Sequence, residues 1–175
     1  ATPEKVSAVV EANNRFALDL YKNLSSDDGN LLFSPYSVFS ALAMTYEGAR
    51  SETGDEIRAV FNFPEADVMR PGVARLYNEM NSEESYALNV ANALWIQEDY
   101  ELLEDYLEVV KNYYGGSAEN KDFIGDPEGS RIAINRWVED RTNEKIEDLI
   151  PPGIINRMTR IILTNAVYFK GSWAH

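Results

Sequence analysis

The chain has 175 residues, of which 45% are apolar and 26% charged, a composition typical of one globular domain and not of a disordered segment. Its formal net charge of -13 argues against partners that carry many phosphates, so neither nucleic acid nor an anionic membrane surface is expected. The chain contains no cysteine, which excludes disulfides, thiol catalysis and cysteine metal sites.

The first part of the chain predicts helices. Apolar residues recur at helical spacing over residues 5–24 and predict an amphipathic helix. Residues 30–33 predict a short apolar strand. Ser34 and Pro35 then form a helix start, because a serine oxygen caps free N–H groups and proline suits the first helical position. The helix over residues 35–46 is apolar nearly all round, so we expect it to be buried with Ser34 and Ser37 at its buried N-terminus.

Two further helices are predicted before the first long strand. One covers residues 51–61, with acidic residues early, where they favour the helix dipole. The next is expected to begin near Pro71. Residues 86–97 predict a strand with two unlike faces. One face is large and apolar apart from Asn92 and should face a core, and the other carries small residues that leave room for a crossing helix.

The second part alternates helices and strands. Residues 102–114 predict a helix closed by Gly115 and Gly116. Residues 117–123 are polar enough for an edge strand. A further helix begins at Asp126-Pro127 and runs to Arg141, before a turn leads to the last strand. This order favours an α+β fold with a mixed or predominantly antiparallel sheet.

The last strand, residues 161–169, is β-branched and aromatic, as in strands covered on both faces. Asn165 is the polar member of one apolar face. Such an amide either is a satisfied core asparagine that fixes the strand register, or forms a polar lock where the sheet must open. Because a buried strand needs neighbours on both sides, we expect the chain to be the front part of a larger fold.

No pattern of catalytic residues is present. The chain lacks a G-x-S-x-G elbow, a P-loop and an H-E-x-x-H motif, and its single histidine, His175, is the last residue. The numerous carboxylates lie in patterns typical of solvated helix surfaces, or lack the spacing of a calcium loop. We therefore expect no enzyme activity, no catalytic residue, no metal and no cofactor.

Three sequence features concern the compartment. No stretch is apolar enough to cross a membrane, so no membrane partner is expected. The first residues lack a signal-peptide pattern, but a processed leader would leave the same sequence, and we favour an extracellular location. Asn23-Leu24-Ser25 fits the N-glycosylation pattern, which also occurs frequently by chance.

Four groups of residues resemble the serpin family, in the family's order. They correspond to the helix B region, the second strand of the large sheet A, helix F with the segment after it, and the third strand of sheet A. In that order they are Asn30-Leu-Leu-Phe-Ser-Pro-Tyr-Ser-Val38 with Ala41-Leu-Ala-Met44 and Gly48-Ala49; Ala91-Asn-Ala-Leu-Trp95; Asn135-Arg-Trp-Val138 with Thr142, Lys145-Ile146 and Leu149-Ile150; and Leu163-Thr-Asn-Ala-Val-Tyr-Phe-Lys-Gly-Ser-Trp173.

The resemblance implies an α+β serpin fold over residues 1–175. The chain would be the N-terminal part of a single domain, with helices A–F and the first three strands of sheet A, incomplete without the C-terminal half. The resemblance also implies roles for individual residues. A polar "shutter" below the centre of sheet A would comprise Ser34, Ser37 and Asn165. The "breach", where the sheet first opens, would contain Trp173. Packing between sheet A and helix F would involve Ala91, Ala93 and Trp137.

The implied function is inhibition of a serine or cysteine endopeptidase by a suicide mechanism. The protease cleaves a reactive-centre loop, which then inserts into sheet A beside residues 160–170 of a metastable protein. That loop is not in this chain. The expected partners are therefore the target protease and the missing C-terminal half. The lack of cysteine would suit a prokaryotic, thermostable member of the family.

Two alternatives remain open on the sequence. The first is a serpin fold without inhibitory activity, acting as a binding or storage protein. The missing hinge of the reactive loop would distinguish a non-inhibitory serpin from an inhibitory one, because small hinge residues permit insertion of the loop whereas charged residues, bulky residues or proline impede it. The second is an unrelated enzyme domain with a carboxylate-only site, which a strongly shifted pKa would support.

We expect the 175-residue chain, expressed alone, to aggregate, because its last strand would expose an apolar edge. Size-exclusion chromatography and urea unfolding of the isolated chain provide the measurement. A monomeric chain that unfolds cooperatively would contradict this expectation.

Overall fold

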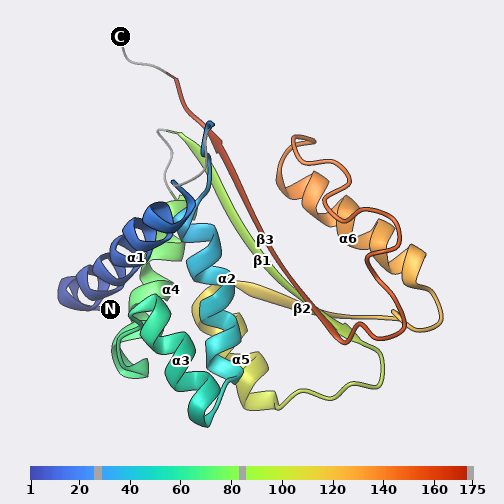
Figure 1. Cartoon of the computed structure of the whole chain (residues 1–175), viewed down its shortest axis with the longest axis horizontal. Helices are drawn as coiled ribbons and strands as arrows, with labels where there is room; N and C mark the ends of the chain where they lie inside the picture. Colours follow the sequence, from blue (N-terminus) through green and yellow to red (C-terminus); the bar gives the residue numbers. More distant parts are fainter. Residues whose placement is uncertain (26–28, 83–85, 173–175) are drawn as a thin grey trace.

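A three-stranded sheet separates two unequal layers of helices (Figure 1). The computed structural model describes residues 1–25, 29–82 and 86–172. The helices are α1 (Pro3–Leu24), α2 (Pro35–Gly48), α3 (Ser51–Phe61), α4 (Ala66–Ser82), α5 (Glu104–Tyr114) and α6 (Pro127–Arg141). The strands are β1 (Ala87–Gln97), β2 (Gly116–Lys121) and β3 (Ile161–Lys170).

The sheet is mixed, with the strand order β2-β1-β3. The central strand β1 pairs in parallel with β2 and antiparallel with β3. In the antiparallel register Asn92 lies opposite Asn165, and Leu94 lies opposite Leu163. The predicted mixed sheet and polar edge strand are confirmed. The strands predicted over residues 86–97, 117–123 and 161–169 are each found within two residues of their expected ends.

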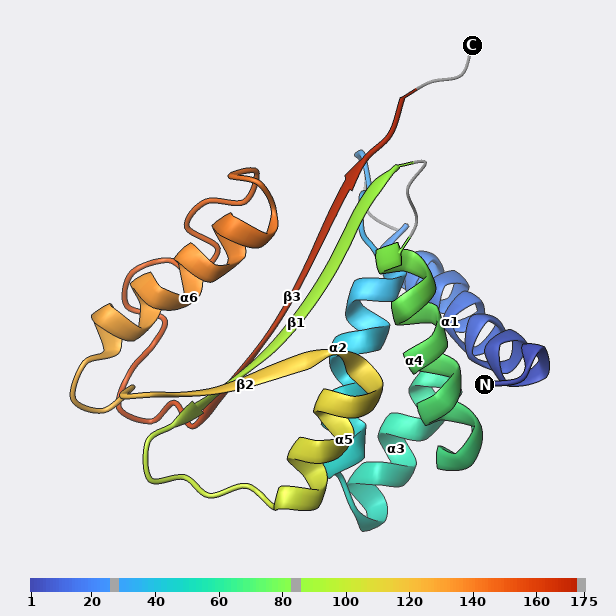
Figure 2. The same ribbon diagram turned by 180° about the vertical axis from the view of Figure 1, so that it is seen from behind.

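The two faces of the sheet pack against different cores, as Figure 2 shows from the opposite side. Helices α1 to α5 lie on one side, with a core that includes Phe16, Phe39, Met44 and Tyr114. Of the described helices, α6 is the one on the other side, over a smaller apolar cluster. The predicted helix crossing the small face of β1 is therefore confirmed.

Helix α4 begins at Ala66, five residues before Pro71, so the predicted start near Pro71 is wrong. A proline inside a helix leaves the carbonyl four residues earlier without its usual donor. That carbonyl belongs to Asp67, and it accepts a hydrogen bond of 2.6 Å from the Nζ of Lys5 in α1. A contact from another helix thus compensates the proline, and no local pattern in α4 reveals it.

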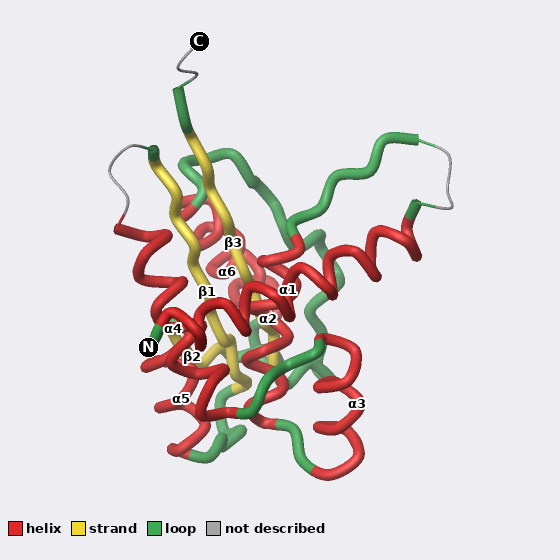
Figure 3. Tube along the Cα trace, turned by 90° about the vertical axis from the view of Figure 1, so that its left-hand side faces the viewer, coloured by secondary structure: helices red, strands yellow, loops and turns green. Residues whose placement is uncertain are grey.

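Residues 30–33 do not form a strand, in contrast to the prediction. The segment runs in the open toward α2 (Figure 3), and Leu32 is 97% exposed. An apolar run becomes a strand only when another strand pairs with it, and the described residues provide none there. For the same reason the start of α2 is open: Ser34 is exposed and Ser37 is half-buried, so the predicted buried N-terminus is wrong for this chain.

Gly72 allows α4 to approach α1 closely. A Cβ atom there would lie 2.6 Å from Val9 Cγ2 and 2.8 Å from the backbone oxygen of Lys5. We therefore expect Gly72→Ala to lower the free energy of unfolding of the intact protein, meaning this chain with the remainder of its sequence, by about 1–3 kcal/mol. Urea unfolding measures the change.

Gly54→Ala provides the matched control within a helix. A Cβ at Gly54 would meet its nearest atom, the backbone oxygen of Ala49, at an ordinary 3.5 Å. Because alanine is the better helix former, this change should raise the free energy of unfolding by up to about 1 kcal/mol. Equal effects of the two substitutions would contradict the proposed close approach of α1 and α4.

Candidate functional site

A polar cluster lies in the middle of the sheet, on the side of α2. The Nδ2 of Asn165 in β3 donates to the Oδ1 of Asn92 in β1 at 2.7 Å and to the Oγ of Ser40 in α2 at 3.2 Å. One side-chain amide thus connects two strands and the helix below them. Since the surrounding positions on these strands are apolar, each of these bonds also satisfies a group that would be costly to bury alone.

Serines continue the cluster along α2 toward its start. The Oγ of Ser40 donates to the backbone oxygen of Ser37 at 3.3 Å. The Oγ of Ser37 donates to the Oγ of Ser34 at 3.0 Å, and the Ser34 oxygen also accepts from the backbone N–H of Ser37, as a helix cap. The structure therefore brings Ser34 and Ser37 together, but Asn165 reaches them only through Ser40.

The side-chain oxygen of Asn165 takes no part in these bonds. The Oδ1 of Asn165 is buried and has no hydrogen-bond partner among the described residues. A buried acceptor without a donor costs about 1–3 kcal/mol. The cluster thus has a vacant acceptor position for one more donor, next to the free edge that β3 has in the described sheet.

The opposite face of the sheet is apolar and lies under α6. Ala93 and Trp95 are buried there, and the ring of Trp95 meets the ring of Trp137 from α6 edge-on at 5.6 Å. The Nε1 of Trp95 donates to the Oγ1 of Thr164 at 3.0 Å, which connects β1 to β3 a second time. Ala91 is also buried, beside a polar cavity of about 320 Å³ that Trp137 lines as well.

The segment that follows α6 is held on that helix. The side chain of Asn135 forms two bonds with the backbone of Ile150, one from its Nδ2 at 3.0 Å and one to its Oδ1 at 2.9 Å. Arg131 donates to the same carbonyl at 2.9 Å. Ile150 and Ile155 from this segment belong to the cluster under α6, so the helix and its return segment form one cover over the sheet.

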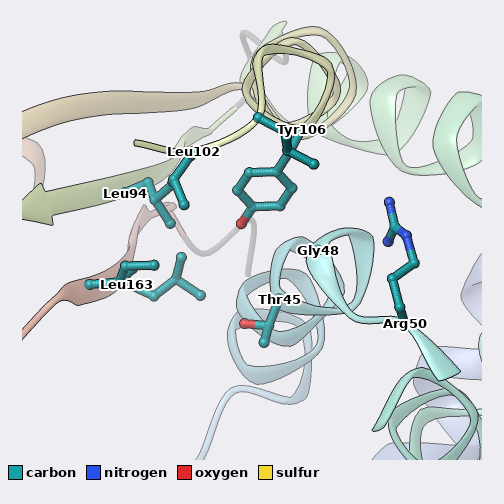
Figure 4. A pocket seen from close by; sticks show the side chains of 9 residues that line it. Thr45, Gly48, Arg50, Leu94, Leu102, Tyr106 and Leu163 are labelled. Carbon is teal, nitrogen blue, oxygen red and sulfur yellow. The ribbon is translucent and has the colours of Figure 1, made fainter. Parts of the chain in front are cut away.

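An apolar hollow of about 500 Å³ is lined by the C-terminal part of β1, the N-terminal part of β3 and the helices α2 and α5. Figure 4 shows Leu94, Leu163, Leu102 and the ring of Tyr106 turned toward it. The guanidinium of Arg50 lies on the side away from the strands. Mostly apolar walls make this hollow a place for apolar side chains and not for a charged substrate.

Of the residues predicted from sequence, Trp173 lies outside the described residues. Sequence reasoning missed Ser40, Asn92 and Thr164, which make the actual connections of Asn165 and Trp95. A signal existed for Asn92, because both asparagines are polar exceptions on apolar strand faces. The described residues contain no group of acidic or histidine side chains arranged to hold a metal. None of the described helices has the length and hydrophobicity to cross a bilayer.

Known proteins resemble this chain along nearly its whole length. The family model described as "Serpin (serine protease inhibitor)" matches residues 11–175. A protein of Methanosarcina mazei described as uncharacterized and serpin-like is 47% identical over 95% of this chain and 41% of its own length. The leukocyte elastase inhibitor of Xenopus tropicalis is 36% identical over 93% of this chain and 44% of its own length.

The same is true of solved structures. The structure of ovalbumin from emu (Dromaius novaehollandiae) matches with a TM-score of 0.91 at 29% identity, over 96% of this chain and 48% of the ovalbumin chain. The chain therefore spans about half the length of the proteins that it matches.

Asn165→Asp tests the polar cluster. The change removes both N–H donors and places a carboxylate beside the Asn92 oxygen, so the free energy of unfolding of the intact protein should fall by about 2–4 kcal/mol. Asn120→Asp, the same substitution at an exposed position of β2, should change it by less than about 0.5 kcal/mol. Similar values for the two variants in urea unfolding would argue against a special role of the Asn165 amide.

Proposed function

Because the chain belongs to the serpin family, we propose that the intact protein inhibits a serine or cysteine endopeptidase. A reactive loop, cleaved by the protease, inserts into the sheet beside β3. The observation that carries the proposal is the polar cluster around Asn165, whose amide joins β1, β3 and α2 and keeps a buried oxygen that has no partner among the described residues. Such a cluster beside a strand edge suits a sheet that is closed in one state and opened in another.

The predicted fold class is confirmed, since the mixed sheet and its helices match serpin structures over about half of those chains. We take the 175 residues as the N-terminal part of a single domain that continues outside this chain. Two features support this assignment. In the described sheet the outer edge of β3 has no neighbour, and the apolar hollow next to Leu163 is open. Both would be covered by segments of the remaining half.

The proposed mechanism is driven by the sheet itself. A strand added beside β3 would satisfy backbone N–H and C=O groups and bury apolar side chains, so the inserted state lies lower in free energy. Before insertion, Asn165 acts as the shutter together with Ser40, and with Ser37 and Ser34 behind it. Its vacant Oδ1 would accept a donor from the remaining half, and insertion would break that contact.

The cover on the opposite face has a part in this proposal. Helix α6 lies over Ala93 and Trp95, with Trp137 against the Trp95 ring, so the sheet cannot widen without movement of this cover. The Trp95–Thr164 bond keeps β1 and β3 together, which directs opening to the outer edge of β3. Trp173, three residues after the end of β3, is assigned to the breach on its sequence alone.

No catalytic step is assigned to this protein, because serpins are generally protease inhibitors and not enzymes. The elastase inhibitor among the relatives supports an inhibitory role. The ovalbumin structure supports the second candidate, a serpin fold without inhibitory activity that binds or stores. The composition of the hinge outside this chain distinguishes the two.

The test is incubation of the intact protein with a panel of serine and cysteine endopeptidases, followed by denaturing gel electrophoresis. An inhibitor of this kind gives a band at the summed mass of protein and protease that survives SDS, and the protease loses activity. A protease blocked at its nucleophile provides the control and should give no such band. Cleavage of the protein without a stable complex, at full remaining protease activity, would favour the non-inhibitory candidate.

A further inference from the structure

Glu47 is an unusual carboxylate. It lies in the last turn of α2, where the helix dipole disfavours a negative charge, and only 4% of its side chain is exposed. A buried carboxylate in such a position requires strong partners. Two side chains from other helices provide them, so this position connects three helices.

The first partner is Arg70 of α4. Its Nη2 donates to one carboxylate oxygen of Glu47 at 2.8 Å, and its Nε lies 3.2 Å from both oxygens. The second partner is Tyr114, the last residue of α5, whose hydroxyl donates to the Oε1 of Glu47 at 2.8 Å. Burial, and then the nearby Glu47 charge, raise the pKa of Tyr114 well above its ordinary value, so the phenol keeps its proton and remains a donor.

Tyr114 has a second connection, through its backbone. Its carbonyl lies at the end of α5, where no intrahelical donor remains, and accepts a hydrogen bond of 2.9 Å from the Nδ2 of Asn92. The Oδ1 of Asn92 accepts from Asn165. Hydrogen bonds therefore connect Arg70, Glu47 and the Tyr114 hydroxyl, and the Tyr114 carbonyl, Asn92 and Asn165; the covalent frame of Tyr114 joins the two sets.

We propose that Glu47, Arg70 and Tyr114 form a positioning centre that holds Asn92, and through it Asn165, in the closed arrangement of the sheet. The Tyr114 ring is fully buried and fixed at its hydroxyl by Glu47, so its backbone carbonyl is fixed as well. Gly115, with φ of 61°, follows directly and leads into β2, whose first residue Gly116 pairs with Asn92. The end of α5 is therefore held to β1 by this backbone pairing and by the Asn92 side chain.

The ion pair is more than a source of stability in this proposal. A buried ion pair contributes little net stability compared with well-packed apolar residues of similar size, because both charges lose their hydration. What the carboxylate provides is an oriented acceptor for the Tyr114 hydroxyl. The effect of this positioning centre on the opening of the sheet rests on the proposed function, whereas its effect on the mobility of β1 and β3 does not.

Hydrogen exchange followed by mass spectrometry, on peptides of the intact protein that cover β1 and β3, tests the proposal. Tyr114→Phe removes only the hydroxyl, and we expect amide exchange in both strands to become about tenfold faster. In an Asn165→Ala background the same substitution should add less than about twofold, because the chain of bonds is already broken. Glu79→Gln, which breaks the exposed Arg75–Glu79 pair on α4, should leave both strands within about twofold.

A triple variant, Glu47→Leu with Arg70→Leu and Tyr114→Phe, separates positioning from stability. We expect its unfolding temperature to stay close to that of the parent, while exchange in β1 and β3 remains fast. Faster exchange confined to α5, or an unchanged sheet in Tyr114→Phe, would overturn the proposal. If the parent protein forms no SDS-stable protease complex, the proposed function fails, but the exchange rates still decide whether this centre positions the sheet.

Discussion

The structure depends on two hydrogen bonds donated by one side-chain amide. Asn165 lies opposite Asn92 in the sheet and above Ser40 of α2, so its Nδ2 holds two strands and a helix at once. In an apolar surrounding such bonds are directional and costly to lose, whereas apolar contacts would allow the strands to slide. A sheet closed by a few polar hydrogen bonds can be well ordered in one state and can still open when those bonds are exchanged for bonds to other partners.

The two faces of the sheet are stabilised by different interactions. On the α2 side, polar bonds fix where β1 and β3 lie relative to the helices. On the α6 side, the Trp95 ring packs on Trp137 and its N–H reaches Thr164, so the two strands stay together under an apolar cover. The combination makes the outer edge of β3 the natural place for a change in the sheet, in line with the proposed insertion beside it.

The sequence predicted the elements for which local chemistry is decisive. Alternating large and small residues gave the two faces of β1 and the crossing helix, and Ser34-Pro35 gave the start of α2. It did not predict features that depend on distant partners. Pro71 lies inside α4 because Lys5 of another helix takes up the freed carbonyl, and residues 30–33 lack a strand to pair with. Likewise, Asn165 bonds to Ser40 and not to Ser34, because the helix geometry presents that serine to the strand.

We propose that the sheet of the intact protein is closed in a metastable state beside β3. The most direct measurement is the thermal unfolding midpoint of the intact protein before and after a single proteolytic cut in its exposed loop. Insertion of the cut loop would add a strand of backbone hydrogen bonds, and the midpoint should rise by at least ~10 °C. An unchanged or lower midpoint after complete cleavage would contradict the account, because it would mean that the sheet does not accept a strand.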